Sequence, residues 1–406
     1  MTRRVGPTPG EEPPESKAGW LNRSTLGMGL TSLFSDLGHE TASSILPLFL
    51  ASLGAPAAAL GVIEGVSDAL SSFAKLGAGW IGDRVERRKP IVVGGYLLTG
   101  VATGAFGLAT AWPQVLVSRA IGWLGRGVRG PLRDAMLADA VEPKARGGAF
   151  GLERAGDTLG AVLGPATALL LISALTFRRM FLLTIVPGVI AALCFLVLVK
   201  ERVRASIRPR RFGEAIGALP PGFRSYLLAV GLLGAGDFAH TLLILHASQA
   251  LIPSLGPTRA GAVAIGLYTL HNGVYAAASI PSGMLGDRFG KRRLLVGGYL
   301  LAAAMSLGFV LASPLWWQFA LLFAVGGLYI AVEDTLERAM AADLLPQDLR
   351  STGYGALAAA NGLGDFLSSV LVGVLWTAVS PAAGFLYAGA LSLLGAALMS
   401  RIRRSA

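Results

Sequence analysis

Long apolar runs alternate with short polar segments along the whole chain. Most runs are about 17–25 residues long, which is the length an α-helix needs to cross the hydrocarbon core of a bilayer. The pattern therefore predicts an all-α membrane protein with twelve transmembrane helices. The predicted spans are residues 25–53, 57–80, 91–111, 113–137, 148–172, 180–199, 225–250, 260–284, 294–313, 315–338, 352–377 and 382–400.

Composition agrees with a polytopic membrane protein. The 406 residues are 53% hydrophobic and 15% charged, and they include 54 glycines, more than a soluble domain of this size would use. Residues 1–23 are polar and proline-rich with no apolar stretch, so we expect a disordered tail and not a signal peptide. The single cysteine, Cys194, lies within a predicted span, which excludes a disulfide framework.

The formal net charge of +11 is unevenly placed. Lys and Arg gather in the segments after the even-numbered spans, chiefly at 84–89, 200–224 and 288–293. By the positive-inside rule these segments and both termini lie in the cytoplasm, with the chain in the inner (plasma) membrane. The charge is therefore explained by topology, and we expect no nucleic-acid partner.

The chain contains an internal repeat. "GWIGDRVERRKP" at 79–90 and "GMLGDRFGKRRL" at 283–294 share Gly-x-x-x-Asp-Arg and a basic cluster at an offset of 204 residues. We therefore expect two six-helix halves of the same orientation. The predicted segments are a cytoplasmic tail (1–23), an N-terminal bundle (24–199), a cytoplasmic linker (200–224), a C-terminal bundle (225–400) and a second tail (401–406).

These two loops resemble the best-known motif of the major facilitator superfamily (MFS), although Glu86 stands where the family usually has glycine. "GAVLGP" at 160–165 is similar to a motif of its antiporters, and equally to any small-residue helix contact. The resemblance implies the MFS fold, alternating access, efflux rather than import as in drug–proton antiporters, and a monomer. It also implies a gating role for Asp83, Arg84, Asp287 and Arg288.

Ionisable residues recur inside the predicted spans. Each costs about 2.5–3.5 kcal/mol at a helix centre, so each is a candidate functional residue. An Asp-x-x-His pair occurs at the middle of the first span and again in the seventh, and in the resembled fold these pairs face each other across a central cavity. The candidates are Asp36, His39, Glu40, Glu64, Asp68, Asp237, His240 and His271.

Three interpretations of the paired Asp-x-x-His remain open at this point. A carboxylate beside a histidine can load and release protons near neutral pH. Two aspartates and two histidines, namely Asp36, His39, Asp237 and His240, could instead bind a divalent transition metal. The third interpretation is that the groups pair with one another and hold the halves together.

Charge is inverted between equivalent positions of the fourth and tenth spans. The fourth span ends with Arg126, Arg129 and Arg133. At the offset of 204, Arg129 falls on Glu333 and Arg133 on Glu337. We expect these to form ion pairs that latch a cytoplasmic gate in the outward-facing state. The alternative is that each set of charged side chains is solvated or pairs within its own half. Asp157 is expected to pair with an arginine of the fourth span.

No phosphate-binding loop and no nucleophile–base pair is found, so we expect neither an enzyme nor a cofactor. The sequence predicts a transporter that uses an ion gradient, with proton-coupled efflux of a small molecule favoured. Its partners would be that substrate, protons and the lipid bilayer. The alternatives are export of a divalent metal by the same residues and, from another class, a non-transporting receptor or assembly partner.

Overall fold

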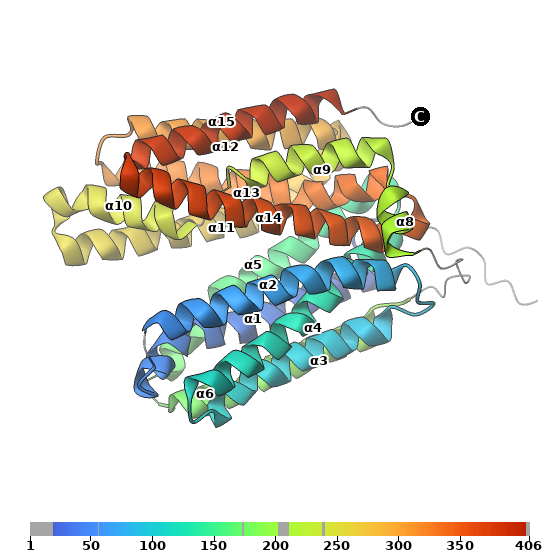
Figure 1. Cartoon of the computed structure of the whole chain (residues 1–406), viewed down its shortest axis with the longest axis horizontal. Coiled ribbons are helices and arrows are strands. Elements are labelled where there is room, and N and C mark those ends of the chain that lie inside the picture. Colours follow the sequence, from blue (N-terminus) through green and yellow to red (C-terminus); the bar gives the residue numbers. More distant parts are fainter. Residues whose placement is uncertain (1–18, 56, 173, 202–210, 238–239, 403–406) are drawn as a thin grey trace, which may run out of the picture.

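The computed structural model describes residues 19–402 except 56, 173, 202–210 and 238–239. Some further side chains within helices, including those of Glu64, Asp68 and His240, also lie outside the description. The described chain is built from helices, and Figure 1 shows them in two groups that lie one above the other. The first group comes from the N-terminal part of the chain and the second from the C-terminal part.

The N-terminal group, called the N half below, runs from α1 to α7. The predicted sixth span is divided at Thr184 into α6 and α7, and a 3-10 turn extends α3. The elements are α1 (Arg23–Ser52), α2 (Ala57–Gly82), α3 (Lys89–Gly104) with η1 (Ala105–Leu108), α4 (Trp112–Asp139), η2 (Pro143–Ala145), α5 (Arg146–Leu171), α6 (Phe177–Leu183) and α7 (Ile185–Leu198).

A short linker helix, α8 (Phe212–Gly217), precedes the C half. The predicted seventh span is divided into α9 and α10, so that Asp237 lies between two helices and not within one. The elements are α9 (Pro221–Gly234), α10 (His240–Leu255), α11 (Pro257–Phe289), α12 (Lys291–Leu311), α13 (Trp316–Leu344), η3 (Gln347–Leu349), α14 (Arg350–Ala378) and α15 (Pro381–Arg401).

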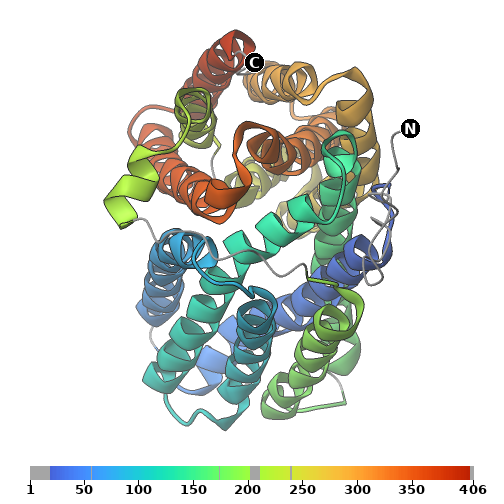
Figure 2. The same cartoon turned by 90° about the vertical axis from the view of Figure 1, so that its right-hand side faces the viewer.

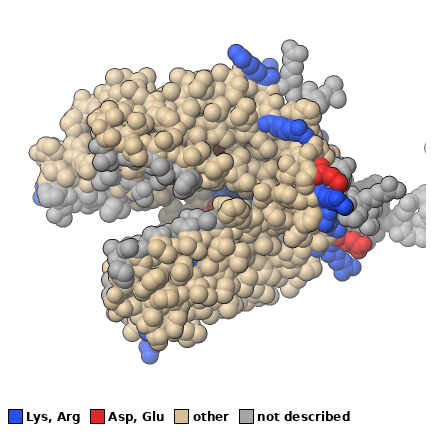
Figure 3. Space-filling view, in the orientation of Figure 1, with Lys and Arg blue, Asp and Glu red and all other residues tan. Residues whose placement is uncertain are grey.

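The two halves meet at one end of the molecule and separate at the other. Figure 3 shows a wedge-shaped cleft between them that narrows toward the side on which α8 lies in Figure 1. We call that side the closed end and the opposite side the open end. Viewed toward the closed end, α2 lies against α14 and α5 against α11 (Figure 2), which are also the most extensive contacts between the halves.

Glycines allow this close approach. A Cβ on Gly79 of α2 would collide with the backbone of Ser351, and a Cβ on Gly283 of α11 would collide with the backbone of Gly147. Gly79 and Gly283 are related by the offset of 204, so the same contact is made twice. Small residues at such positions let helix backbones touch, which is how helices commonly associate in membranes.

Five of the described helices are apolar and long enough to cross a membrane on length and hydropathy alone. They correspond to residues 89–108, 177–198, 291–311, 316–344 and 381–401. Several other long helices, such as α1, α4 and α5, carry several charged residues that are buried inside the protein. The outer faces seen in Figure 3 are mostly uncharged, while Lys, Arg and acidic side chains gather at the closed end.

Candidate functional site

The closed end is fastened by an aspartate from each half. Both carboxylate oxygens of Asp83, at the end of α2, accept hydrogen bonds from the backbone N–H groups of Ser351 (2.9 Å) and Thr352 (2.6 Å). These N–H groups belong to the first turn of α14, where a helix has unsatisfied donors and the positive end of its dipole. Asp83 therefore caps a helix in the opposite half.

Asp287 makes the same contact in reverse. Near the end of α11, it accepts from the N–H groups of Gly147 (3.0 Å) and Gly148 (2.9 Å) in the first turn of α5. The two sites are related by the internal repeat, so the closed end carries two equivalent latches. We call them the Asp83 latch and the Asp287 latch.

Each latch is reinforced by an ion pair between the halves. Asp139 of α4 pairs with Arg350 at the start of α14, and Asp343 of α13 pairs with Arg146 at the start of α5 (2.8 Å). Each of these aspartates also binds a cation of its own half, Arg88 for Asp139 (3.1 Å) and Lys291 for Asp343 (2.8 Å). The aspartates and arginines of both pairs again obey the offset of 204.

The arginines that follow the two latch aspartates each stack on an aromatic ring. Arg84 lies over the ring of Trp80, with its guanidinium carbon 3.6 Å from the ring centroid. Arg288 lies 5.2 Å from the ring centroid of Phe289. Both residues follow a latch aspartate directly in sequence, and each stacks on an aromatic ring close to it in the chain.

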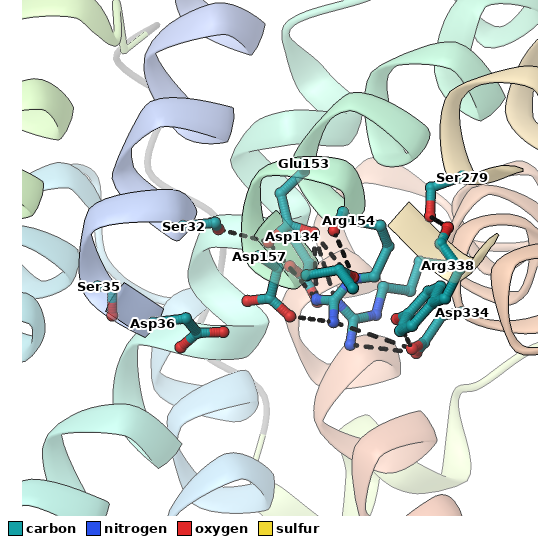
Figure 4. Close-up of polar contacts among 12 residues, drawn as sticks. Ser32, Ser35, Asp36, Asp134, Glu153, Arg154, Asp157, Ser279, Asp334 and Arg338 are labelled. Carbon is teal, nitrogen blue, oxygen red and sulfur yellow. Dashed lines mark hydrogen bonds and ion pairs between the residues drawn. The ribbon is translucent and has the colours of Figure 1, made fainter. Parts of the chain in front are cut away.

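Deeper in the molecule, charged residues of α4, α5 and α13 form a network between the two halves (Figure 4). We call it the floor network. Glu153 of α5 is fully buried and binds Arg133 (2.8 Å) and Arg154 (3.2 Å). Arg154 also binds Asp157 at 2.7 Å and approaches Asp334 of the C half at 3.9 Å. Because a buried charge without a partner is costly, the loss of one member of this network would leave its partners uncompensated.

Arg338 of α13 completes the network from the C half. Its guanidinium lies 3.6 Å from Glu153 and 3.9 Å from Asp134. Asp134 and Arg338 occupy equivalent positions of the repeat, so a pair of opposite charges meets at the pseudo-twofold axis. Asp134 is also held by Arg133 at 2.9 Å.

The predicted pairing of Arg129 with Glu333 and of Arg133 with Glu337 is wrong for this structure, although the closed end is shut. Arg133 binds carboxylates of its own half, and Arg129 donates to Ser35 Oγ (2.9 Å). Glu337 accepts from Tyr299 and Asn361 of the C half. Arg129, Arg133 and Glu337 each have a partner within their own bundle, so the charge inversion at these two positions does not produce contacts between the halves.

Asp36 lies on α1, which packs against α4 and α5. One carboxylate oxygen binds Arg126 at 3.1 Å. The prediction that Asp157 pairs with an arginine of α4 is wrong in its partner, since the ion pair is with Arg154 on α5 itself.

His39 and Glu40 follow Asp36 on α1. The imidazole Nε2 of His39 is 3.6 Å from Glu40, and its ring lies 4.7 Å from the ring of Trp123 on α4. His39 is buried, whereas the Glu40 side chain is 35% exposed. Glu40 is thus the member of this group most open to the surroundings.

The C half holds its carboxyl groups differently. Glu337 is buried, and its carboxylate accepts from the Tyr299 hydroxyl at 2.5 Å and from Asn361 Nδ2 at 3.2 Å. Asp237 accepts from the Tyr329 hydroxyl at 2.6 Å. Tyrosine hydroxyls are therefore hydrogen-bond partners of these two carboxyl groups.

Two further predicted residues lie in the same bundle. Glu333 lies on α13 between Tyr329 and Glu337, and its Oε2 atom is buried with no hydrogen-bond partner among the described residues. His271 of α11 is buried against Tyr268 and places its Nδ1 atom 3.2 Å from the carbonyl of Phe323. A small pocket beside Asp237 and Tyr329 opens between α9, α12 and α13.

The metal interpretation gains no support. Among the described residues, no group of three or more His, Cys, Asp or Glu side chains is placed to hold a metal ion. Asp36 binds an arginine and Asp237 binds a tyrosine, so both carboxylates already have other partners. The predicted site residues Glu64, Asp68 and His240 have side chains outside the described part of the structure.

Sequence reasoning missed several residues that organise these sites. Glu153 and Arg154, which were not among the predicted site residues, form the centre of the floor network. Tyr299 and Tyr329 carry no charge and give no signal in an apolar run. Tyr329, Glu333 and Glu337 are spaced by four residues, which places them on one face of α13. That spacing could have identified Tyr329 from the sequence.

Comparison with known proteins agrees with the fold. The family model described as "Major Facilitator Superfamily" matches residues 28–259 and 227–405. An uncharacterised MFS-type transporter of Methanocaldococcus jannaschii is 31% identical over 93% of this chain and 94% of its own. A multidrug resistance protein (MdtH) of Aeromonas hydrophila is 27% identical over 69% of this chain and 70% of its own.

A solved structure gives the same result. The fucose:proton symporter of E. coli has a TM-score of 0.76, with 14% identity over 96% of this chain and all of that chain. The twelve-helix MFS fold predicted from the sequence is thereby confirmed, and the family is one of multi-pass membrane transporters and not of enzymes. This chain belongs to the major facilitator superfamily.

Proposed function

We propose that this chain is a proton-coupled secondary transporter that exports a small molecule through the cytoplasmic membrane by alternating access. The closed end would face the cytoplasm, because the basic loops that follow α2 and α11 lie there. The cleft then opens to the outside. Efflux is favoured by the similarity to a multidrug resistance protein and by the antiporter-like "GAVLGP" segment.

The observation that carries proton coupling is the environment of Glu337. This carboxyl group is 2% exposed, and its hydrogen-bond partners are a tyrosine hydroxyl and an amide, with no cation bound to it among the described residues. An isolated buried carboxylate is expensive, so the neutral acid is favoured when the site is dry. Opening of the closed end would admit water and allow the proton to leave.

A path to Glu337 follows one face of α13. Tyr329, Glu333 and Glu337 are spaced by four residues, and Tyr329 contacts Asp237 beside the pocket. Protons would enter through the cleft and pass along these carboxyl groups toward the closed end. Asp36 of α1, which is buried, is a second candidate for proton exchange in the N half.

The latches provide the conformational switch. The Asp83 and Asp287 latches exist while the closed end is shut and must break when it opens, so they give the two states different energies. In this proposal, Asp83 and Asp287 are gating residues. Arg129, Arg133, Glu333 and Glu337 are not partners of one another, and Arg133 supports the floor through Glu153.

The experiment uses purified protein in liposomes that contain a pH-sensitive dye, with a panel of small organic molecules added as candidate substrates. A transported molecule should move protons in wild type, and Glu337→Gln should abolish the proton signal. The control is Glu214→Gln in α8, an exposed residue of the linker. Transport of a molecule by the wild type without any proton movement would contradict the proposal, as would full proton movement in Glu337→Gln.

A further inference from the structure

One face of α4 carries a line of arginines. Arg119, Arg126, Arg129 and Arg133 follow at steps of seven, three and four residues, which places them on the same side of the helix. α4 runs from the open end to the closed end, so the line extends down the N half toward the floor network. Four guanidinium groups on one membrane helix require an explanation, because each is costly to bury.

The arginines differ in how well they are paired. Arg133, nearest the floor, binds both Asp134 and Glu153. Arg126 binds Asp36 through Nη2, while its Nη1 atom is buried without a hydrogen-bond partner among the described residues. Arg129 binds no carboxylate in the described structure.

Arg129 is the clearest case. It is 5% exposed, donates through Nη2 to the neutral hydroxyl of Ser35 and stacks on the ring of Tyr96 at 3.8 Å. Its Nη1 atom is also buried with no hydrogen-bond partner among the described residues. Ionised donors that are buried and left without an acceptor are strongly unfavourable, so this position lacks an anion.

The two α4 arginines whose Nη1 atoms lack a hydrogen-bond partner among the described residues are neighbours on that helix. Arg126 and Arg129 are one turn apart on α4, and they reach Asp36 and Ser35, which are adjacent on α1. The Arg126 side chain is 30% exposed, so this arginine is accessible to water, whereas Arg129 is buried. The ring of Trp123 lies within 5.8 Å of the Arg126 guanidinium carbon and supplies an apolar wall.

From this geometry we infer that Arg126 and Arg129 bind the anionic group of the transported molecule, which would be a singly charged organic anion such as a monocarboxylate. The inference rests on the proposed transport function and names the class of its substrate. A carboxylate can accept two parallel hydrogen bonds from guanidinium groups. Asp36 is then an internal competitor that occupies Arg126 until the substrate arrives.

The test is direct binding to purified protein in detergent, with no need for transport. The probes are acetate, benzoate and 1-naphthoate, and each is compared with its neutral amide. Binding is followed by thermal stabilisation and by quenching of tryptophan fluorescence. At least one carboxylate should bind, its amide should bind about tenfold more weakly or worse, and high salt should weaken the carboxylate.

Substitutions locate the site. Arg126→Gln and Arg129→Gln should each weaken the carboxylate by about tenfold, and Arg126→Lys should weaken it less. Asp36→Asn should instead tighten binding, because it removes the competitor. A variant that was merely misfolded could not bind more tightly. Arg259→Gln, at an exposed position of α11, is the matched control and should bind as wild type does.

Three results would overturn the inference. These are binding of none of the carboxylates, equal binding of acid and amide, and undiminished binding in both Arg126→Gln and Arg129→Gln. The proton measurement on Glu337→Gln is independent of these experiments. If carboxylates bind at Arg126 and Arg129 but no proton moves, the anion site stands and the proposed coupling fails.

Discussion

The two halves share one fold but differ in the partners of several buried carboxyl groups. In the N half, carboxylates such as Glu153 and Asp157 are bound to arginines. In the C half, Glu337 and Asp237 are hydrogen-bonded to tyrosine hydroxyls. A carboxylate beside arginine stays ionised, whereas one beside a neutral hydroxyl in a dry site can exchange a proton.

This difference suggests a division of labour. A network of fixed charges holds the shape of the N half and, in our inference, leaves guanidinium groups open for an anionic substrate. The C half has carboxyl groups whose protonation can change without loss of a salt bridge. Gene duplication gives two equivalent scaffolds, and after that each can acquire its own chemistry.

The halves remain alike where they touch. The Asp83 and Asp287 latches have the same geometry, and their supporting pairs, Asp139 with Arg350 and Asp343 with Arg146, follow the same repeat. Symmetry is therefore kept at the contact between the halves, and it is lost among the buried carboxyl groups inside each bundle.

The largest expected effect is on stability, and it would break the comparison if absent. Arg133→Gln removes one cation that binds both Asp134 and the fully buried Glu153. This change should cost about 3 kcal/mol of unfolding free energy. Glu337→Gln keeps the size of the side chain and should cost less than about 1 kcal/mol. Thermal and denaturant unfolding in detergent would measure both, and equal losses would contradict the distinction between the halves.

The latches should respond alike. Asp83→Asn and Asp287→Asn each weaken two charge-assisted hydrogen bonds to a helix N-terminus, worth about 1.5–3 kcal/mol apiece when the acceptor is charged. Both variants should therefore open the closed end more often, and by similar amounts.

Cysteine labelling would detect that opening. Ser351→Cys, in a Cys194→Ser background, places a buried thiol at the Asp83 latch. Labelling should be slow with both latches intact and faster in either aspartate variant. A large effect from one latch and none from the other would contradict their equivalence, and unchanged labelling in both would remove the latches from the gate.

The smallest effect concerns a single hydroxyl. Tyr299→Phe removes the 2.5 Å hydrogen bond to Glu337 and should cost about 1 kcal/mol of stability. Tyr387→Phe on α15 is a matched control with no described link to Glu337. If Tyr299→Phe and Tyr387→Phe lose the same free energy of unfolding, the Tyr299 hydroxyl does not stabilise the Glu337 carboxyl group.

The sequence predicted the architecture because its signals are local. Span length, the placement of Lys and Arg, and the repeated loops at Asp83 and Asp287 each depend on neighbouring residues in the chain. Which helix ends those aspartates cap depends on how two bundles meet, and no local pattern contains that.

The pairing of buried charges was harder to predict. Charge inversion at Arg133 and Glu337 suggested a contact between the halves, but Glu153, on the adjacent helix α5, is a closer partner for Arg133. Sequence offsets identify equivalent positions, and they do not reveal the direction of a side chain. Tyr299 was missed for a related reason, since a tyrosine in an apolar run is indistinguishable from ordinary packing until its hydroxyl is located.

The most direct test of the account is the protonation state of Glu337, measured by infrared difference spectroscopy between acidic and alkaline pH on purified protein. We predict a carbonyl band of a buried carboxylic acid that changes with pH, is lost in Glu337→Gln and persists in Glu214→Gln. Loss of that band alone would assign proton exchange to the C half. An unchanged spectrum in Glu337→Gln would contradict the claim and return the search to Asp36 and Asp157.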